Sequence, residues 1–278
     1  MELNEIPHGR TLTDDVDDCR VPPGQFAMWW LGQQSFILKL GQAVLYLDPF
    51  LTPLPERRVE PLLSAAEIRN ATLVLGSHDH LDHIDRAHWP GLAAASPEAR
   101  FIVPSLLREG LSRDLGLDVG RLLGVDDGLS VEHAGVRVTG VAAAHELLDR
   151  DPATGCFPYL CYVIEGNGCT LLHAGDTCVY EGLLTKLRRW RFDAVMLPIN
   201  GRDARRLRAN CLGNMTYQEA ADLAGGLSPA LTIPAHYDMF AFNSADVNEF
   251  IDYMDVKYPH LPTRIFQYGQ RFLGRKSR

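Results

Sequence analysis

The sequence lacks the closely spaced cysteine pairs that zinc ribbons and redox motifs need. Its six cysteines are scattered at positions 19, 156, 161, 169, 178 and 211. Isolated thiols of this kind are usually small buried apolar side chains, which fits a reducing compartment. The sequence also has no apolar run of 18 residues, and its acidic first 20 residues contain no signal-like apolar stretch. These absences predict a cytoplasmic protein without a membrane span.

Basic residues are also scarce, with 27 lysines and arginines against 35 acidic residues and a net charge of -8. A protein that binds the phosphate backbone of nucleic acid usually shows the opposite balance. Long polyanions are therefore not expected as partners, although a small anion could meet a local basic patch. A chain of this length buries roughly three quarters of its unfolded surface, so it needs no disulfide or structural metal to fold. The expected partner is a small molecule, and a homo-oligomer is left open.

The chain is predicted to consist of an N-terminal arm and a single domain. Residues 1–21 are rich in aspartate and end at a Pro-Pro-Gly turn, so they are interpreted as an arm. Residues 22–278 contain no repeat, low-complexity segment or linker, which favours one domain. The stretch Pro49–Pro61 is expected to be a loop, because its four prolines would each break regular structure.

Strands and helices are expected in two similar halves. Strands are predicted at 26–31, 35–40, 43–47, 72–75, 101–103, 135–143, 159–165, 170–173, 194–198, 230–233 and 264–268. Helices are predicted at 105–115, 180–190, 217–224 and 246–258. The third helix has a capping box of Thr216 and Glu219, and Gly225 is placed as its C-cap. Two strand-rich halves of this kind predict an α/β sandwich of two mixed sheets with helices outside.

The most informative motif is the string SHDHLDH, which runs from Ser77 to His83 directly after a short apolar strand. Imidazole and carboxylate groups are ligands for zinc, manganese and iron. Three histidines and an aspartate within six residues can converge on a metal without help from distant parts of the chain. A solvated polar turn is the alternative, but this spacing rarely arises by chance. The candidate ligands in this string are His78, His80, Asp82 and His83.

Further ligands are expected where other strands end. His145 follows one strand, Asp176 follows another after a Gly that permits a tight turn, and His236 follows a third. A lone histidine is usually not a ligand, but the shared position after a strand raises the three above that expectation. His173 lies within a strand and is predicted to be a core residue or to support a ligand. No pattern supports the remaining histidines His8, His88, His133 and His260.

These motifs together resemble the metallo-β-lactamase superfamily, whose fold is a four-layer αββα sandwich. Within it, the chain resembles the ascorbate-6-phosphate lactonase (UlaG-like) branch. The branch resemblance rests on the segments Pro23–Gly32, Ser77–Asp85 and Ala174–Thr177, and it spans about residues 22 to 272. The chain departs from that lactonase in its compact Pro49–Pro61 loop, and His145 follows the general superfamily pattern instead.

The resemblance implies two divalent metal ions, zinc or manganese with iron as a third candidate. Asp176 would bridge the two ions, and Asp82 and His83 would be the catalytic residues. Two ions about 3.5–4 Å apart bring the pKa of a bound water close to neutrality, so a metal-bound hydroxide is the expected nucleophile. The implied ligands of the first ion are His78, His80 and His145, and those of the second are Asp82, His83 and His236.

The basic stretch after the predicted strand 194–198 is the best clue to the substrate. It contains four arginines, and guanidinium groups bind phosphate and carboxylate well. Asn200 and Arg202, nearest the strand end, are predicted substrate contacts, and Tyr237 and Asp238 are predicted to line the pocket. The other three arginines could equally be a solvated surface run.

Three functions remain open at this point. The first is a lactonase or related carboxylic ester hydrolase that acts on a small polar, sugar-derived compound. This compound is expected to be anionic or polyhydroxylated, and both a phosphorylated and an unphosphorylated form are left open. The second is a phosphodiesterase for small cyclic or dinucleotide substrates. The third is a metal-binding scaffold that has lost catalysis, which the full ligand set disfavours.

Overall fold

The computed structural model describes residues 6–277, and within them the chain forms two sheets. The seven-stranded sheet has the order β13 (Arg271–Arg275), β1 (Gln25–Gly32), β2 (Ser35–Leu40), β3 (Ala43–Leu47), β4 (Leu73–Leu75), β5 (Arg100–Pro104), β6 (Leu122–Val125). The six-stranded sheet has the order β12 (Thr232–Ala235), β11 (Ala194–Pro198), β10 (Cys169–His173), β9 (Leu160–Gly166), β8 (Val136–Ala142), β7 (Ser130–His133). Both sheets mix parallel and antiparallel pairs.

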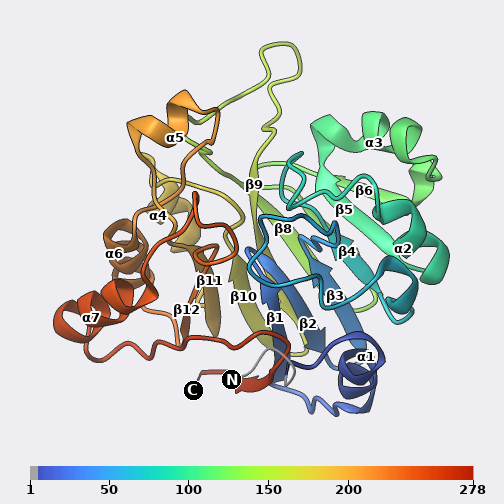
Figure 1. Cartoon of the computed structure of the whole chain (residues 1–278), viewed down its shortest axis with the longest axis horizontal. Helices are drawn as coiled ribbons and strands as arrows, with labels where there is room; N and C mark the ends of the chain where they lie inside the picture. The colour runs from blue at the N-terminus through green and yellow to red at the C-terminus, as the bar shows by residue number, and fades with distance from the viewer. Residues whose placement is uncertain (1–5, 278) are drawn as a thin grey trace.

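Helices cover the outer face of each sheet (Figure 1). The first sheet is covered by α1 (Gly9–Asp18), α2 (Trp89–Ala95) and α3 (Arg108–Leu115). The second sheet is covered by α4 (Leu183–Leu187), α6 (Tyr217–Leu227) and α7 (Val247–Lys257). The short helix α5 (Ala204–Arg208) buries none of its residues and lies beyond the sheet. This arrangement is the predicted αββα sandwich.

Strand β1 shows why the sheets pack in layers. Its side chains alternate between two apolar clusters, because successive residues of a strand point to opposite faces. Phe26, Met28 and Trp30 face the core between the two sheets, whereas Ala27 and Trp29 face the helices α1 and α2. A strand that buries both faces reads as a continuous apolar run, which is what the sequence of β1 shows.

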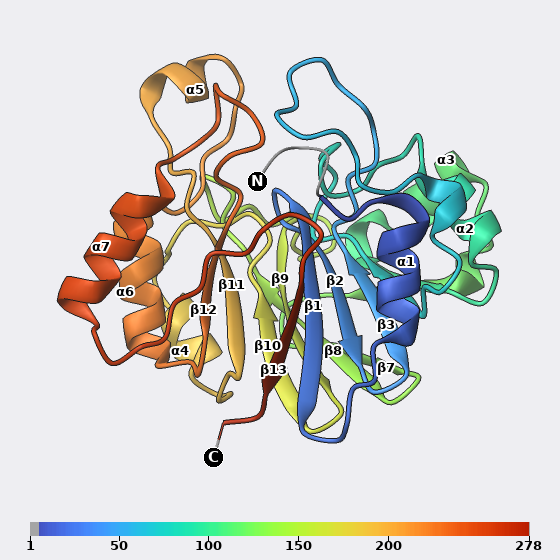
Figure 2. The ribbon, with the colours of Figure 1, turned by 60° about the horizontal axis from the view of Figure 1, so that its bottom comes forward.

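Several predicted elements need correction. The predicted arm contains α1, whose Leu12 and Val16 are fully buried against the first sheet; residues 1–5 lie outside the described part. The closing strand is 271–275 instead of 264–268, and it pairs with β1 (Figure 2). The predicted helix at 180–190 is reduced to α4, and neither α2 nor α5 was predicted.

The capping box of α6 is confirmed, but its predicted C-cap is wrong. Thr216 and Glu219 cap the first turn as expected. The helix continues through Gly225 to Leu227, and the left-handed residue after it is Ser228, with φ of 50°. A Cβ on Gly225 would lie 2.2 Å from the ring of Tyr258, so this glycine allows the close approach of the two segments.

No helix in the described residues is long and apolar enough to cross a membrane.

Candidate metal centre

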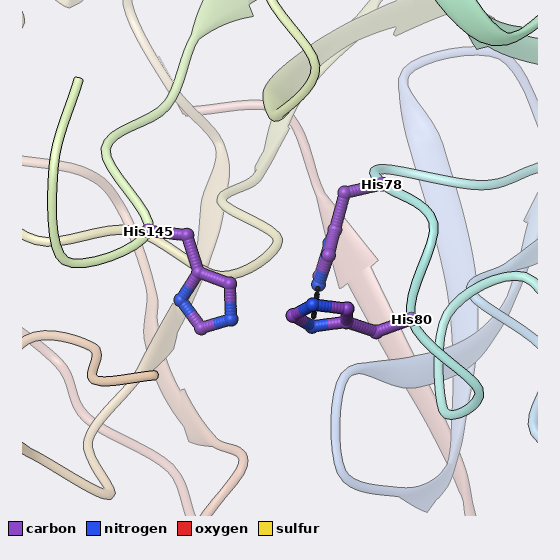
Figure 3. A group of neighbouring side chains, drawn as sticks. All are labelled: His78, His80 and His145. Carbon is purple, nitrogen blue, oxygen red and sulfur yellow. Dashed lines mark hydrogen bonds between the residues drawn. The ribbon is translucent and has the colours of Figure 1, made fainter. Parts of the chain in front are cut away.

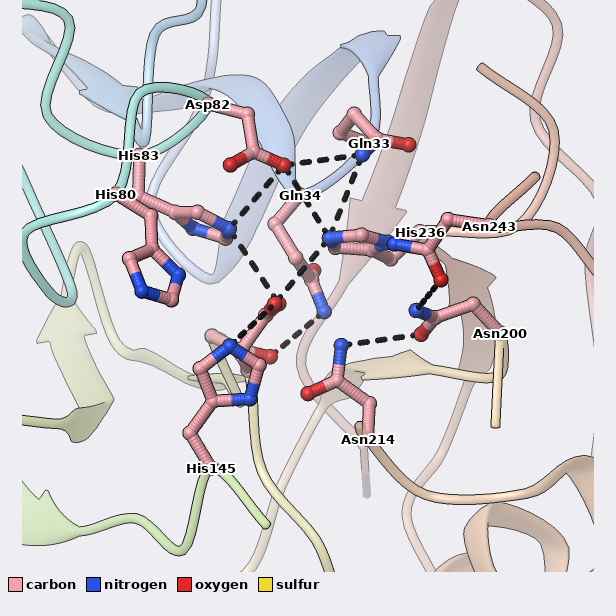
Figure 4. A network of polar contacts seen from close by, with 12 residues as sticks. Gln33, Gln34, His80, Asp82, His83, His145, Asn200, Asn214, His236 and Asn243 are labelled. Carbon is pink, nitrogen blue, oxygen red and sulfur yellow. Dashed lines mark hydrogen bonds and ion pairs between the residues drawn. The ribbon is translucent and has the colours of Figure 1, made fainter. Parts of the chain in front are cut away.

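Seven predicted ligands come together at the ends of strands from both sheets. The turn after β4 carries four of them, and the segments after β8, β10 and β12 each carry one. The six of these that are labelled in Figures 3 and 4 point toward a common space. They form three overlapping groups whose donor atoms lie within 4.8 Å of one another: His78, His80 and His145; His78, His83 and Asp176; Asp82, His83 and His236.

The first group consists of three imidazoles. His78 Nε2 lies 3.0 Å from His80 Nδ1, and the ring of His145 is 5.0 Å from that of His80 (Figure 3). Burial lowers the pKa of each of the three, and the neighbouring His83 lowers it further. Because a neutral imidazole keeps a lone pair on one ring nitrogen, this group is ready to bind a cation near pH 7.

The group of Asp82, His83 and His236 pairs a carboxylate with two imidazoles. Asp82 Oδ2 lies 3.6 Å from His83 Nε2 and 3.4 Å from His236 Nε2. Burial opposes the charged form of Asp82, but His83 and His236 outweigh it, and the pKa of Asp82 is lowered. Burial likewise lowers the pKa of His236, but its carboxylate neighbours, chiefly Asp176, raise it to about 9.

Asp176 lies between the two groups. Its Oδ1 is 3.4 Å from His83 Nε2, and its Oδ2 is 3.6 Å from His145 Nε2 and 3.3 Å from His236 Nε2. Burial raises the pKa of Asp176, but His236 and His83 outweigh it and hold that pKa well below its ordinary range. This carboxylate is therefore placed to contact cations held by either group.

The donor set fits divalent metal ions. Donors bound to one tetrahedral ion at about 2.0–2.2 Å lie roughly 3.3–3.6 Å apart, which matches the separations around Asp176 and Asp82. His83 Nε2 and Asp176 Oδ1 are buried and have no hydrogen-bond partner among the described residues. A buried polar atom without a partner is unfavourable, and a metal ion would satisfy both atoms. Nitrogen and carboxylate oxygen donors suit zinc, manganese or iron.

A buried aspartate that the sequence analysis missed orients His83. Asp48, at the end of β3, has no exposed surface and accepts a hydrogen bond of 2.6 Å from His83 Nδ1. It also accepts from the backbone N–H and the hydroxyl of Ser77, each at 2.7 Å. Because Nδ1 donates to Asp48, Nε2 of His83 is the nitrogen directed at the other ligands. Asp48 shares the position after a strand with the predicted ligands, which is the signal that could have identified it.

His145 and His236 are held by backbone and amide groups. His145 Nδ1 lies 3.1 Å from the carbonyl oxygen of Gly213; since a carbonyl only accepts, Nδ1 donates and Nε2 is free to bind a metal. The backbone N–H of His236 donates to the carbonyl of Gln33. The side chain of Gln33 donates to Asp82 Oδ2 at 3.0 Å, so this residue links the two ligands. Sequence reasoning did not single out Gln33 or Gly213.

Four of the eight non-glycine residues with positive φ in the described chain lie at this centre. Gln33, Asp48, Glu146 and His236 all have φ between 43° and 68° without being glycine. Such conformations are unfavourable for residues with a Cβ and persist where the surroundings enforce them. Gln33 and Asp48 support predicted ligands, His236 is one of them, and Glu146 follows another. This edge of the sheets is therefore the functional one.

A cavity of about 420 Å³ opens beside the ligands. Its polar wall consists of His80, Asp82, His145, Asp176 and His236, together with Gln33. Its remaining wall consists of Phe50, Leu54, Leu81, Ala209, Asn210, Cys211, Leu212, Phe240, Phe242 and Asn243. The volume falls in the range of small-molecule sites, roughly 300–1,000 Å³.

Asn200 and Arg202 are not among the residues that line this cavity. Arg202 donates two hydrogen bonds to the carboxylate of Glu219, at 2.6 and 2.7 Å, and a third to the carbonyl of Asn214. Asn200 is buried and bonds to the side chains of Asn214 and Asn243 (Figure 4). The loop after β11 does reach the cavity as expected, but through residues 209–212. The expected arginine contact with an anion thus has no support in the geometry.

Tyr237 and Asp238 are also placed elsewhere. Both line a different cavity, beside Trp30 and Tyr268. Asp238 accepts a short hydrogen bond from the hydroxyl of Tyr268, and the ring of Tyr237 stacks on Trp30 at 5.3 Å. The two residues follow a metal ligand in sequence, but the chain turns at His236 and directs them away from the metal centre.

Two further polar residues near the ligands are structural. Asp85 is buried and accepts hydrogen bonds from the backbone of Leu51 and Thr52, which fixes the proline-rich loop against the ligand turn. His173 lies fully buried at the end of β10, where its Nε2 donates to the carbonyl of Gln34. The prediction that His173 is a core or supporting residue agrees with this position.

Comparison with known proteins gives a consistent picture. Residues 44–237 match the profile of the β-lactamase superfamily domain. A UPF0173 metal-dependent hydrolase of Thermococcus onnurineus is 31% identical over 80% of this chain and 88% of its own length. Another, from Sulfurisphaera tokodaii, is 27% identical over the same shares of the two chains. The solved structure of Igni18, a metallo hydrolase from Ignicoccus hospitalis, aligns with a TM-score of 0.70 and 20% identity over 90% of this chain and 98% of its own.

These relatives do not distinguish the ascorbate-6-phosphate lactonase branch, which stays a prediction. The profile match, the relatives and the converging histidines and aspartates agree on the broader assignment. The chain therefore belongs to the β-lactamase superfamily and is a metal-dependent hydrolase of the metallo-β-lactamase fold.

Proposed function

We propose that the seven ligands hold two divalent metal ions, zinc, manganese or iron, and that the protein hydrolyses a lactone or another carboxylic ester. The observation that carries this proposal is the convergence of seven donors beside a cavity whose described lining contains no lysine or arginine. A substrate with a phosphate or carboxylate group would gain from a cationic wall. An uncharged acyl group needs none.

When bound, the metal ions would supply an activated water and a positive charge that stabilises negative charge on the acyl oxygen. The reaction adds water across the ester: a bond forms between the water oxygen and the acyl carbon, and the carbon–oxygen bond to the leaving alkoxide breaks. One proton leaves the water, and one proton is taken up by the alkoxide. A side chain of the protein must hold this proton after it leaves the water and before the alkoxide takes it up.

Asp82 is the residue placed to hold the proton. Its side chain is 22% exposed, whereas that of Asp176 is 5% exposed, so Asp82 is the carboxylate with better access to the cavity. Gln33 donates to Oδ2 of Asp82, and the same oxygen faces His83 and His236. Oδ1 therefore remains as the acceptor for a proton. The hydrogen bond from Gln33 keeps the Asp82 carboxylate in this orientation, and His83, fixed by Asp48, lies beside it at 3.6 Å.

The lining of the cavity also bears on the alternatives. A phosphorylated lactone carries a negative charge away from the reacting ester, and no lysine or arginine lines the described cavity to receive that charge. We therefore favour an uncharged ester over the phosphorylated lactone. The charge of a phosphodiester would be met by the metal ions, so the assays below separate the ester hydrolase from the phosphodiesterase. A cytoplasmic location completes the proposal, and all six cysteines are free, as is usual in a reducing compartment.

The test is a pair of assays on the metal-loaded protein, with an aliphatic lactone and with bis-p-nitrophenyl phosphate. We expect hydrolysis of the lactone and far slower hydrolysis of the phosphodiester. The matched control is Asp82→Ala, which lies on a loop and should fold. Preferred turnover of the phosphodiester would contradict the proposal, as would full activity of the Asp82→Ala variant at equal metal content.

A further inference from the structure

Much of the cavity lining that does not consist of predicted metal ligands is apolar. Five of its residues come from three separate segments of the chain: Phe50, Leu54, Leu212, Phe240 and Phe242. The ring of Phe240 lies 6.2 Å from that of Phe50 and 5.4 Å from that of Phe242. The three rings thus form a continuous aromatic surface from the interior of the cavity to its mouth.

Phe242 is not explained by packing of the core. Its side chain is 62% exposed, and it is the single exposed aromatic residue in the range 6–277. Phe50 and Phe240 are nearly buried and pack a small cluster with Met239. An isolated exposed apolar residue needs no explanation, but one that extends an apolar wall at the mouth of a cavity is typical of a ligand-binding surface.

Asn243 supplies a neutral donor on the same side of the cavity. Its Oδ1 accepts hydrogen bonds from Arg206 Nη1 at 2.9 Å and from Asn200 Nδ2 at 2.8 Å. A guanidinium group can only donate, so the contact with Arg206 fixes which end of the Asn243 amide is the oxygen. Asn243 lines the cavity and lies near His236 (Figure 4). Its Nδ2 is therefore left as a donor for an oxygen atom of the substrate.

We infer that the substrate is a neutral lactone or ester with an apolar alkyl or aromatic group, which packs on Phe50, Phe240 and Phe242 while Asn243 Nδ2 donates to a substrate oxygen. This inference rests on the proposed function and adds the substrate class. The polar ligands on one wall hold the acyl group, and the aromatic wall opposite holds the apolar group. Phe242 and Asn243 are the residues that determine this specificity.

The first experiment measures kcat/KM of the metal-loaded wild type for lactones of one ring size whose alkyl side chains grow from one to eight carbons. Burial of each methylene predicts a rise of up to about fourfold per carbon until the wall is covered. Values that do not depend on chain length would overturn the inference and leave the proposed function intact. Absence of turnover on every lactone would overturn the proposed function and the inference with it.

The second experiment tests the wall with variants that should fold. Phe242→Ala should reduce kcat/KM for the longest side chain by roughly tenfold or more and leave the shortest nearly unchanged. Phe242→Leu should recover part of the loss. Val256→Ala, at a still more exposed apolar position on α7, is the control and should change neither value. Equal losses on short and long side chains would show that Phe242 does not contact the apolar group.

The third experiment tests the donor. Asn243→Asp keeps an oxygen for Arg206 and Asn200 but removes the N–H, so it should reduce kcat/KM about three- to tenfold at every chain length. The loss should be independent of chain length, in contrast to Phe242→Ala. Wild-type kcat/KM in Asn243→Asp would rule out the hydrogen bond to the substrate.

Discussion

Two loops reach the same cavity in different ways. The short turn 78–83 after β4 presents side chains to the cavity, and four of its six residues are predicted metal ligands. The long loop 199–214 after β11 presents residues 209–212 to the cavity, while its polar side chains bond within the fold. Arg202 holds Glu219, and Arg206 holds Asp203 and Asn243.

The difference follows from how each loop is stabilised. The turn 78–83 is too short to move its ligands apart. Asp48 holds it from a neighbouring loop, and Asp85, two residues after the turn, accepts a hydrogen bond from the backbone of Leu51. The loop 199–214 is long and must be held in place, so its charged groups form ion pairs and caps. In a tight turn at a strand end, polar side chains can face the cavity, because the turn needs few contacts to hold it. In a long loop, polar side chains often bond to the protein and hold the loop in place.

The largest effect is expected where one side chain serves both ligand groups. Asp176→Ala removes the carboxylate that lies 3.3–3.6 Å from three ligand nitrogens. We expect loss of bound metal and a fall in hydrolysis of more than about 100-fold, because even residues that only support a ligand often cost 10- to 100-fold. Metal content and lactone hydrolysis measure this. Unchanged metal content would show that Asp176, from the second sheet, does not bind a metal together with the turn 78–83.

The next effect tests the support of the short turn. Asp48→Asn keeps the size of the side chain but weakens its contact with His83, so metal affinity should fall by about 10- to 100-fold. Competition with a metal chelator measures the affinity. Asp79→Asn, on the exposed side of the same turn, is the control and should change the affinity little. Equal effects of the two variants would contradict the role of Asp48.

A third effect tests the backbone of the long loop. A Cβ on Gly213 would lie 2.1 Å from Cβ of Arg202 and 2.7 Å from Oε2 of Glu146. Gly213→Ala should therefore reduce the free energy of unfolding by about 1–3 kcal/mol and shift the carbonyl that His145 contacts. Chemical denaturation and metal affinity measure the two consequences. A stable variant with normal metal affinity would show that this loop does not position His145.

The smallest effect tests the arginines. Arg202→Ala should reduce the free energy of unfolding by about 1 kcal/mol, since its partly exposed ion pair with Glu219 is lost. Arg205→Ala, whose side chain is exposed on the same loop, should reduce it by much less. Activity of Arg202→Ala should change by the same factor on a neutral lactone and on its phosphorylated analogue. A loss confined to the phosphorylated compound would restore Arg202 as an anion contact.

The structure brings the seven predicted ligands together, because their signal in the sequence is local. Each lies in a short segment that follows a strand, and strand ends from the two sheets meet at one edge. Asp48 follows a strand too, but a single aspartate before a proline carries no motif of its own. The positions of Arg202 and Tyr237 could not be predicted, because they depend on a partner 17 residues away and on the left-handed turn at His236.

The fold shows the same division between local and distant causes. The capping box of α6 was predicted from four adjacent residues. The end of that helix was not, because the space beside Gly225 is occupied by Tyr258 from another segment. The helix α1 was missed because its acidic surface hides the few apolar residues, Leu12 and Val16, that pack on the first sheet.

The central claim is that the seven side chains bind two divalent ions. The most direct test is a crystal structure of the metal-loaded protein, with anomalous scattering used to locate the ions. We expect two ions about 3.5–4 Å apart. One would be bound by His78, His80 and His145, the other by Asp82, His83 and His236, and both by Asp176, at about 2.0–2.2 Å. Ions bound by other residues, or no ion at this centre in the presence of excess metal, would contradict it.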